Sequence, residues 1–163
     1  SYFIKDCQTP RIFEQDGMQS KFLKSYDRLD ARLEITEIIA NEKINSLIIP
    51  PYFNCFRELL GNKDIFFQEH DDGNFMLGSK KIFDAYLPRM RALNFEYASS
   101  HPQSGGSMSK VLRDTYLSLD ESQFKKIKDQ FPKYQFVLTE QGHALDYRKI
   151  YENNLWIIYD LKN

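Results

Sequence analysis

Hydrophobic positions along the chain change their spacing several times, and each change predicts a new element of secondary structure. The apolar run Leu47-Ile48-Ile49 stops at Pro50-Pro51, where proline has no backbone N–H to extend a strand. Apolar residues recur at helical spacing before this run, over residues 27–41, and after it, over residues 53–60. Residues 47–51 therefore predict a buried strand between two helices, and we expect this strand to be the central one of a sheet.

The same signals predict more strands further along the chain. Residues 64–68 and 134–139 are short apolar stretches of strand length, separated by helical patterns. Residues 148–151 and 155–161 flank Asn153-Asn154, and asparagine tolerates the positive φ of a tight hairpin turn. Strands separated by helices pair in parallel through crossover connections, whereas a hairpin pairs antiparallel.

Helical patterns fill the segment between the second and third predicted strands. Ser79 can cap the first of these helices, and Pro88 within it should kink the helix or divide it. Residues 101–107 form the most loop-like stretch of the chain, and a second helix follows them. Asp120, with Gln123 three residues later, has the pattern of a capping box that opens a third helix.

Together these elements predict an α/β domain of Rossmann-like type, with a three-layer, mostly parallel mixed sheet and a C-terminal antiparallel hairpin. At 163 residues the chain fits a single domain, which we place at residues 27–163. Residues 1–26 predict a lead-in segment with weak structure of its own, of the kind that a membrane-proximal linker provides. The chain begins at Ser1 without a Met, as an excised piece of a longer protein would.

Composition and charge argue against several classes of protein. Charged residues make up 28% of the chain and apolar residues 42%, which is a globular rather than a disordered composition. The 22 basic and 23 acidic residues are interspersed, without a basic stripe, so we expect no nucleic acid partner. No apolar run is long enough to span a bilayer, and no signal peptide is recognisable. Cys7 and Cys55 have neither the spacing of a metal site nor the number needed for a disulfide framework.

Candidate functional residues follow the predicted strands, because ligands of open α/β sheets bind beyond the carboxyl ends of the strands. If the three strands are parallel neighbours, the turns that follow them share one rim. Its imidazoles and carboxylates would suit general acid–base catalysis in a small free-standing hydrolase or transferase. The alternative is that polar residues gather there only because turns are solvated. Their spacing is not that of a metal site, so no metal is predicted. The candidate catalytic residues are His70, Asp71, Glu140 and His143.

The candidates for ligand binding are Tyr52, on the same rim, and two arginines, Arg57 and Arg89. Either arginine could clamp a carboxylate or phosphate, although pairing with Asp or Glu on a neighbouring element is the commoner arrangement. Ser104-Gly105-Gly106-Ser107 offers backbone N–H groups to an anion, but it lacks the lysine of a P-loop. The chain has no nucleophile elbow and no dinucleotide glycine fingerprint, so no cofactor is predicted.

Several short motifs occur in an order that is similar to one family. They are Leu47 to Pro51, Phe56-Arg57, Lys63 before Ile65-Phe66-Phe67, Arg89 to Leu93, Phe136 to Glu140, Tyr151-Glu152-Asn153 and Leu155 to Tyr159. Over residues 28–163 this order resembles the soluble C-terminal domain that follows the membrane helices of some bacterial multi-pass membrane proteins, including ones similar to GT-C-type glycosyltransferases.

The resemblance implies an extracytoplasmic accessory domain, tethered to a bacterial membrane by preceding transmembrane helices. Its implied partners are the membrane-embedded part of the same polypeptide and a cell-surface or lipid-linked glycan, with any transfer chemistry in the membrane part. Three hypotheses therefore stand: this non-catalytic domain, the small hydrolase or transferase, and a cytosolic protein-binding module. The last would need a large exposed apolar patch, which the 13 Phe and 10 Tyr residues could supply.

Overall fold

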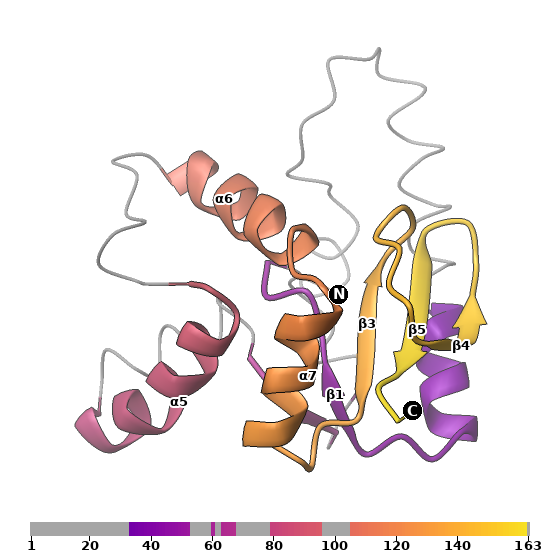
Figure 1. Ribbon diagram of the computed structural model, residues 1–163, viewed down its shortest axis with the longest axis horizontal. Coiled ribbons are helices and arrows are strands. Elements are labelled where there is room, and N and C mark those ends of the chain that lie inside the picture. The colour runs from indigo at the N-terminus through magenta and orange to yellow at the C-terminus, as the bar shows by residue number, and fades with distance from the viewer. Residues whose placement is uncertain (1–32, 53–59, 61–62, 68–78, 96–104, 163) are drawn as a thin grey trace, which may run out of the picture.

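The computed structural model describes residues 33–52, 60, 63–67, 79–95 and 105–162, which form a mixed α/β fold (Figure 1). A helix over residues 33–41 precedes the first strand. The predicted α/β class and the predicted C-terminal hairpin are confirmed. The labelled elements are, in chain order, β1 (Ser46–Ile48), β2 (Asp64–Ile65), α5 (Lys80–Ala92), α6 (Gly105–Leu117), α7 (Glu121–Gln130), β3 (Phe136–Glu140), β4 (Arg148–Glu152) and β5 (Trp156–Asp160).

The described strands form one five-stranded sheet in the order β2-β1-β3-β5-β4. β1 pairs in parallel with β2, where Leu47 lies opposite Ile65, and with β3, where Leu47 lies opposite Phe136. β5 runs antiparallel to both β3 and β4. The prediction that residues 47–51 form the central strand is therefore wrong. β3 is central, because the C-terminal hairpin joins the sheet at β3 and adds two strands on that side.

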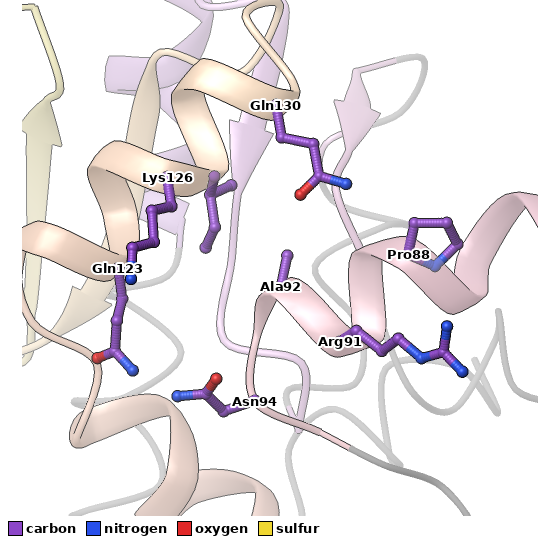
Figure 2. A pocket seen from close by; sticks show the side chains of 8 residues that line it. Pro88, Arg91, Ala92, Asn94, Gln123, Lys126 and Gln130 are labelled. Atoms are coloured by element: carbon purple, nitrogen blue, oxygen red, sulfur yellow. The ribbon is translucent and has the colours of Figure 1, made fainter.

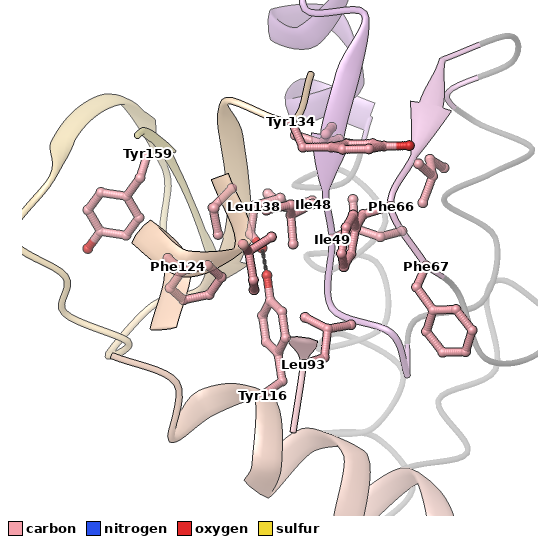
Figure 3. Close-up of a cluster of buried hydrophobic side chains, with 14 of the residues drawn as sticks. Ile48, Ile49, Phe66, Phe67, Leu93, Tyr116, Phe124, Tyr134, Leu138 and Tyr159 are labelled. Atoms are coloured by element: carbon pink, nitrogen blue, oxygen red, sulfur yellow. Dashed lines mark hydrogen bonds between the residues drawn. The ribbon is translucent and has the colours of Figure 1, made fainter. Parts of the chain in front are cut away.

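The core lies between the sheet and the helices that pack on it (Figure 3). All five residues of β5 are buried, so both faces of this strand are covered. Tyr116 from α6 packs edge-to-face on Phe124 from α7, with ring centroids 6.1 Å apart. Its hydroxyl donates to the backbone carbonyl of Leu138 at 2.7 Å. This bond ties α6 to β3, and its loss would leave a buried hydroxyl unpaired at a cost of about 1–3 kcal/mol.

Capping groups recognisable in the sequence begin two of the helices. The capping box of α7 is confirmed: Asp120 Oδ1 accepts from the Gln123 N–H at 3.0 Å, and Gln123 Oε1 accepts from the Asp120 N–H at 2.8 Å. Ser79 caps α5, also as predicted. The predicted division at Pro88 does not occur, because α5 runs through this residue as one helix. Proline there removes the hydrogen bond that its own N–H would have donated and crowds the carbonyl four residues earlier, but neither effect ends the helix.

The beginning of α6 corrects the loop prediction for residues 101–107. The helix starts at Gly105, so Gly105 to Ser107 are helical. Glycine is less favourable than alanine in a helix by about 1 kcal/mol, which is why the local pattern favours a loop. Further along the helix Leu112 and Tyr116 are buried. Packing of this apolar face stabilises the helix in spite of the glycines.

The turn between β4 and β5 forms where it is predicted, but for a different reason. Neither Asn153 nor Asn154 has a positive φ. Instead the Asn153 side chain closes the turn, since its Oδ1 accepts from the N–H of Leu155 at 2.9 Å and of Trp156 at 2.8 Å. Asparagine is favoured in turns because it tolerates positive φ and because its side chain can bond to nearby backbone groups. In this turn the side-chain hydrogen bonds are the property that is used.

β4 is the outermost described strand on its side of the sheet and pairs only with β5. A register shift between Lys149 and Tyr151 interrupts its ladder. Arg148 pairs across the hairpin with the buried carboxylate of Asp160 at 2.9 Å, and Lys149 pairs with Glu152 at 3.0 Å. The outer strand is therefore charged and irregular.

Candidate functional site

The carboxyl ends of β1 and β3 lie side by side, because these two strands are parallel neighbours. Tyr52 follows β1 after the Pro50-Pro51 turn, and Glu140 is the last residue of β3. The Tyr52 hydroxyl donates to Glu140 Oε2 at 2.9 Å, and Arg113 Nε, from α6, donates to the same oxygen at 2.8 Å. We call these three residues the rim cluster. Two of the three turns singled out in the sequence thus meet at one edge of the sheet.

Solvent exposure differs among the three side chains of the rim cluster. Tyr52 is 9% exposed, whereas the side chains of Glu140 and Arg113 are 22% and 45% exposed. Burial, and then the charge of Glu140 and the hydrogen bond to it, raise the pKa of Tyr52 far above its ordinary value. Burial opposes the charge of Arg113, but the hydrogen bond and charge of Glu140 outweigh burial and raise the pKa of Arg113. The cluster therefore presents a protonated tyrosine and a permanent cation to one carboxylate.

Two members of the rim cluster, Glu140 and Arg113, have polar atoms that form no hydrogen bond with any described residue. The hydrogen bonds from Tyr52 and Arg113 both end on Glu140 Oε2, and Glu140 Oε1 accepts from no described residue. Arg113 donates to Glu140 through Nε, and its two Nη groups have no partner among the described residues. A hydroxyl group both donates and accepts. An acceptor beside a donor therefore fits a ligand with neighbouring hydroxyls, such as a sugar ring.

His143 points into the core rather than along the rim. Gly142 has φ 93°, which allows a tight turn in which the His143 N–H donates to the Glu140 carbonyl at 3.2 Å. The residue is 7% exposed. Its Nε2 donates to the Leu119 carbonyl at 2.8 Å, and its Nδ1 lies 2.7 Å from the Thr139 hydroxyl oxygen. Because a carbonyl can only accept, Nε2 carries the proton, and in the neutral ring Nδ1 accepts from Thr139. Both ring nitrogens are thus used inside the protein.

Arg89 is engaged in packing at the end of β2. Its Nη1 donates to the Phe66 carbonyl at 2.9 Å. The guanidinium carbon lies 5.0 Å from the ring centroid of Tyr86, 5.5 Å from Tyr134 and 5.7 Å from Phe66. Cation–π contacts of this kind contribute about 0.5–2 kcal/mol each. Arg89 therefore fastens α5 to the sheet.

The other candidate residues, Arg57, His70 and Asp71, lie outside the described residues. Arg113, by contrast, is a member of the rim cluster that the sequence pattern does not single out. It stands three positions before Tyr116, on the same helical side as a core residue, and this spacing is the signal that points to it. Its partner Glu140 becomes evident only once β3 is placed beside β1.

Among the described residues, no group of three or more His, Cys, Asp and Glu side chains could hold a metal ion. None of the helices described is long and apolar enough to cross a bilayer. Comparison with family models, with curated proteins and with solved structures finds no match. Function is therefore inferred from the residues of the chain and their geometry.

Proposed function

We propose that this chain is a non-catalytic accessory domain that binds a hydroxyl-rich ligand at the rim cluster. The observation that carries the proposal is the Arg113–Glu140 pair, whose spare Nη donors and Oε1 acceptor lie at the carboxyl edge of two parallel strands. Ligands of α/β sheets bind at this edge. The ligand would be a cell-surface or lipid-linked glycan handled by a bacterial polytopic membrane protein.

The membrane context of this proposal comes from the resemblance to extracytoplasmic domains. The domain would stand on the extracytoplasmic face, tethered by preceding transmembrane helices, with the membrane-embedded part of the same polypeptide as its partner. The reading frame upstream of the Ser1 codon tests this context. We expect it to encode several apolar segments of about 20 residues. A frame that starts a few codons upstream, without such segments, would contradict the tether.

The geometry of the rim favours binding over acid–base catalysis. A general acid or base must exchange a proton with the substrate within hydrogen-bond reach. His143 uses both ring nitrogens inside the protein, so neither nitrogen is left to exchange a proton with a substrate. This supports the binding domain over a hydrolase or transferase that would use His143 and Glu140 together.

The proposal extends to the finer architecture, a three-layer Rossmann-like arrangement. Its support is the five consecutive buried residues of β5, because a strand covered on one face alternates between buried and exposed positions. In Figure 1, α7 lies in front of the sheet and the helix over residues 33–41 lies behind it. A crystal structure with all helices on one face of the sheet would contradict this arrangement.

Titration of the isotope-labelled chain, followed by NMR, tests ligand binding. The probes are hexose oligosaccharides and a short-chain polyprenyl-phosphate hexose. We expect one or both to shift the amide signals of Tyr52, Arg113 and Glu140 in a saturable way. Arg113→Gln should weaken binding about tenfold, since a hydrogen bond to a charged group contributes about 1.5–3 kcal/mol. Lys80→Gln, at an exposed lysine on α5, should leave binding unchanged. Absence of saturable rim shifts with every probe would contradict the proposal.

A further inference from the structure

A recess lined by polar and apolar side chains lies between α5 and α7 and shares no residue with the rim cluster (Figure 2). Its volume is about 400 Å³, which falls in the range of small-molecule sites, about 300–1,000 Å³. We call it the helix groove. Ile127 forms part of its apolar lining, and its polar side chains are Arg91, Asn94, Gln123, Lys126 and Gln130.

The helix groove carries positive charge that its own helices do not neutralise. α5 has four basic residues and one acidic residue, and α7 has three and two, although the whole chain has a net charge of −1. Arg91 and Lys126 form no ion pair with any residue in the described ranges. The acidic residues of the two helices have partners elsewhere: Asp84 pairs with Lys80, Asp129 pairs with Lys125, and Glu121 accepts from the backbone N–H of Asp146.

Amide side chains add directed hydrogen-bonding groups to this charge. Gln123 Oε1 accepts from the Asp120 N–H at 2.8 Å in the capping box, and the side-chain NH2 group of Gln123 therefore faces the groove (Figure 2). Asn94 follows the end of α5 with φ 57°, and its N–H donates to the Arg91 carbonyl at 3.0 Å. This helix ending sets the Asn94 carboxamide on the side of Gln123, while Gln130 reaches in from the far end of α7 (Figure 2).

From this geometry we infer that the helix groove binds the phosphate monoester of a hydroxylated molecule, that is, a sugar phosphate. Arg91 and Lys126 line the recess from α5 and α7, and in Figure 2 the exposed Arg91 side chain extends away from α7. A phosphate monoester carries about −1.5 to −2 charges at neutral pH, enough to neutralise both cations once the exposed Arg91 side chain turns toward α7, whereas a carboxylate carries a single charge. Amide groups both donate and accept, and so match the hydroxyls beside the phosphate.

The size of the recess favours a small-molecule ligand over a protein partner. A specific protein partner buries about 800 Å² on each side, far more than a recess of this volume presents. The inference also goes beyond the proposed function, since it concerns another site and a soluble, doubly charged ligand. A lipid-linked sugar phosphate is a diester with a single charge, and it should bind the groove more weakly.

The test is an NMR titration of the full chain with glucose 1-phosphate, with glucose and with methyl glucosyl phosphate diester as matched probes. We expect saturable shifts of the amide signals of residues 91–94 and 123–130, with a dissociation constant of about 1 mM or tighter for the monoester. Glucose and the diester should bind at least about tenfold more weakly, since a charge-assisted contact is missing or weakened. Equal affinity for all three probes, or no saturable shift in the groove up to about 10 mM, overturns the inference.

Charge substitutions locate the site. Arg91→Gln and Lys126→Gln should each weaken binding of glucose 1-phosphate about tenfold. Lys125→Gln is the matched control, because this lysine neighbours Lys126 on the same helix but pairs with Asp129 at 3.1 Å. It should change affinity less than about twofold. All three positions are exposed, so the variants should keep the wild-type spectrum away from the groove. An equal loss in the control variant overturns the inference.

Discussion

Two clusters of the same chemical composition stand at opposite ends of the parallel strands. At the amino end Asp64, the first residue of β2, accepts from the Tyr134 hydroxyl at 2.6 Å through Oδ1 and from the Lys133 ammonium through Oδ2. At the carboxyl end the rim cluster also joins a carboxylate, a tyrosine and a cation, but both donors share Glu140 Oε2. The first arrangement uses both carboxylate oxygens, and the second leaves one open.

This difference separates a structural role from a binding role for clusters that are built from the same three kinds of group. A carboxylate with both oxygens paired contributes to stability and offers little to a ligand. A carboxylate with an open oxygen, beside a cation with open N–H groups, keeps the capacity to recognise one. The open cluster is also the one at the carboxyl edge, where ligands of α/β sheets bind. Four sets of substitutions test this contrast.

The largest loss of stability is expected at His143, which lies in the same turn as Glu140 but points into the core. His143→Leu removes the partners of the Leu119 carbonyl and the Thr139 hydroxyl. Each buried group left unpaired costs about 1–3 kcal/mol, so the free energy of unfolding should fall by about 3 kcal/mol in urea denaturation. Thr139→Val, which removes one bond, should cost about 1 kcal/mol. A loss below about 0.5 kcal/mol for His143→Leu would mean that the imidazole is free for another role.

At the amino end, stability should depend on pH. Partial burial tends to raise the pKa of Asp64, but the hydrogen bonds from Lys133 and Tyr134 outweigh it and hold this pKa below its ordinary value of 3.8. A folded-state pKa below the unfolded one stabilises the fold above the unfolded pKa, and this contribution is lost as pH falls through the folded pKa.

Asp64→Asn should therefore lower the free energy of unfolding by about 1 kcal/mol at neutral pH, a modest loss because the side chain is 35% exposed. The difference from the wild type should shrink as pH falls below about 4. Urea denaturation at several pH values measures it. A difference that stays constant across this range would contradict the assigned role of the ionised carboxylate.

The two tyrosines allow a direct comparison of the clusters. Tyr134→Phe and Tyr52→Phe each remove one hydroxyl from a carboxylate, and each should cost about 1 kcal/mol of unfolding free energy. Only Tyr52→Phe should weaken glycan binding, because Tyr52 orients the carboxylate that faces the ligand. Equal effects of both variants on the glycan titration would remove the distinction between the two ends.

The smallest stability effects are expected at the cations. The side chains of Arg113 and Lys133 are 45% and 61% exposed, and exposed ion pairs contribute about 0–1 kcal/mol. Arg113→Gln and Lys133→Gln should therefore shift the urea midpoint little, while only the first reduces glycan affinity. A loss above about 1 kcal/mol for Arg113→Gln would make the rim cluster a structural element instead.

Local signals in the sequence predict the elements well where a few adjacent residues decide the conformation. The prolines after Ile49 end the first strand, the Asp120–Gln123 pair opens α7, and the asparagines before Leu155 close the hairpin. The start of α6 is missed, because the helix-breaking tendency of its glycines is local while the packing that overrides it is not.

The partners within the candidate site could be predicted only in part, because they are distant in the sequence. Tyr52 and Glu140 are identifiable as residues that follow strands, but their contact spans 88 positions and depends on β1 lying beside β3. Arg113 joins them from a helix whose orientation no local pattern describes. Histidine is a common catalytic residue, which is why the sequence points to His143. Its orientation toward the core follows from the turn that the positive φ of Gly142 allows.

The outer strand β4 has a consequence for the solubility of the protein. β5, with the sequence WIIYD, is an apolar segment of the kind that pairs with copies of itself when its backbone is unpaired. In the fold it lies between β3 and β4, so its N–H and C=O groups are occupied on both sides. β4 itself is charged and carries a register shift, which makes it a poor template for another chain. A chain in which β4 detaches would expose β5 as an aggregation-prone edge, so resistance to self-association depends on the least buried of the described strands.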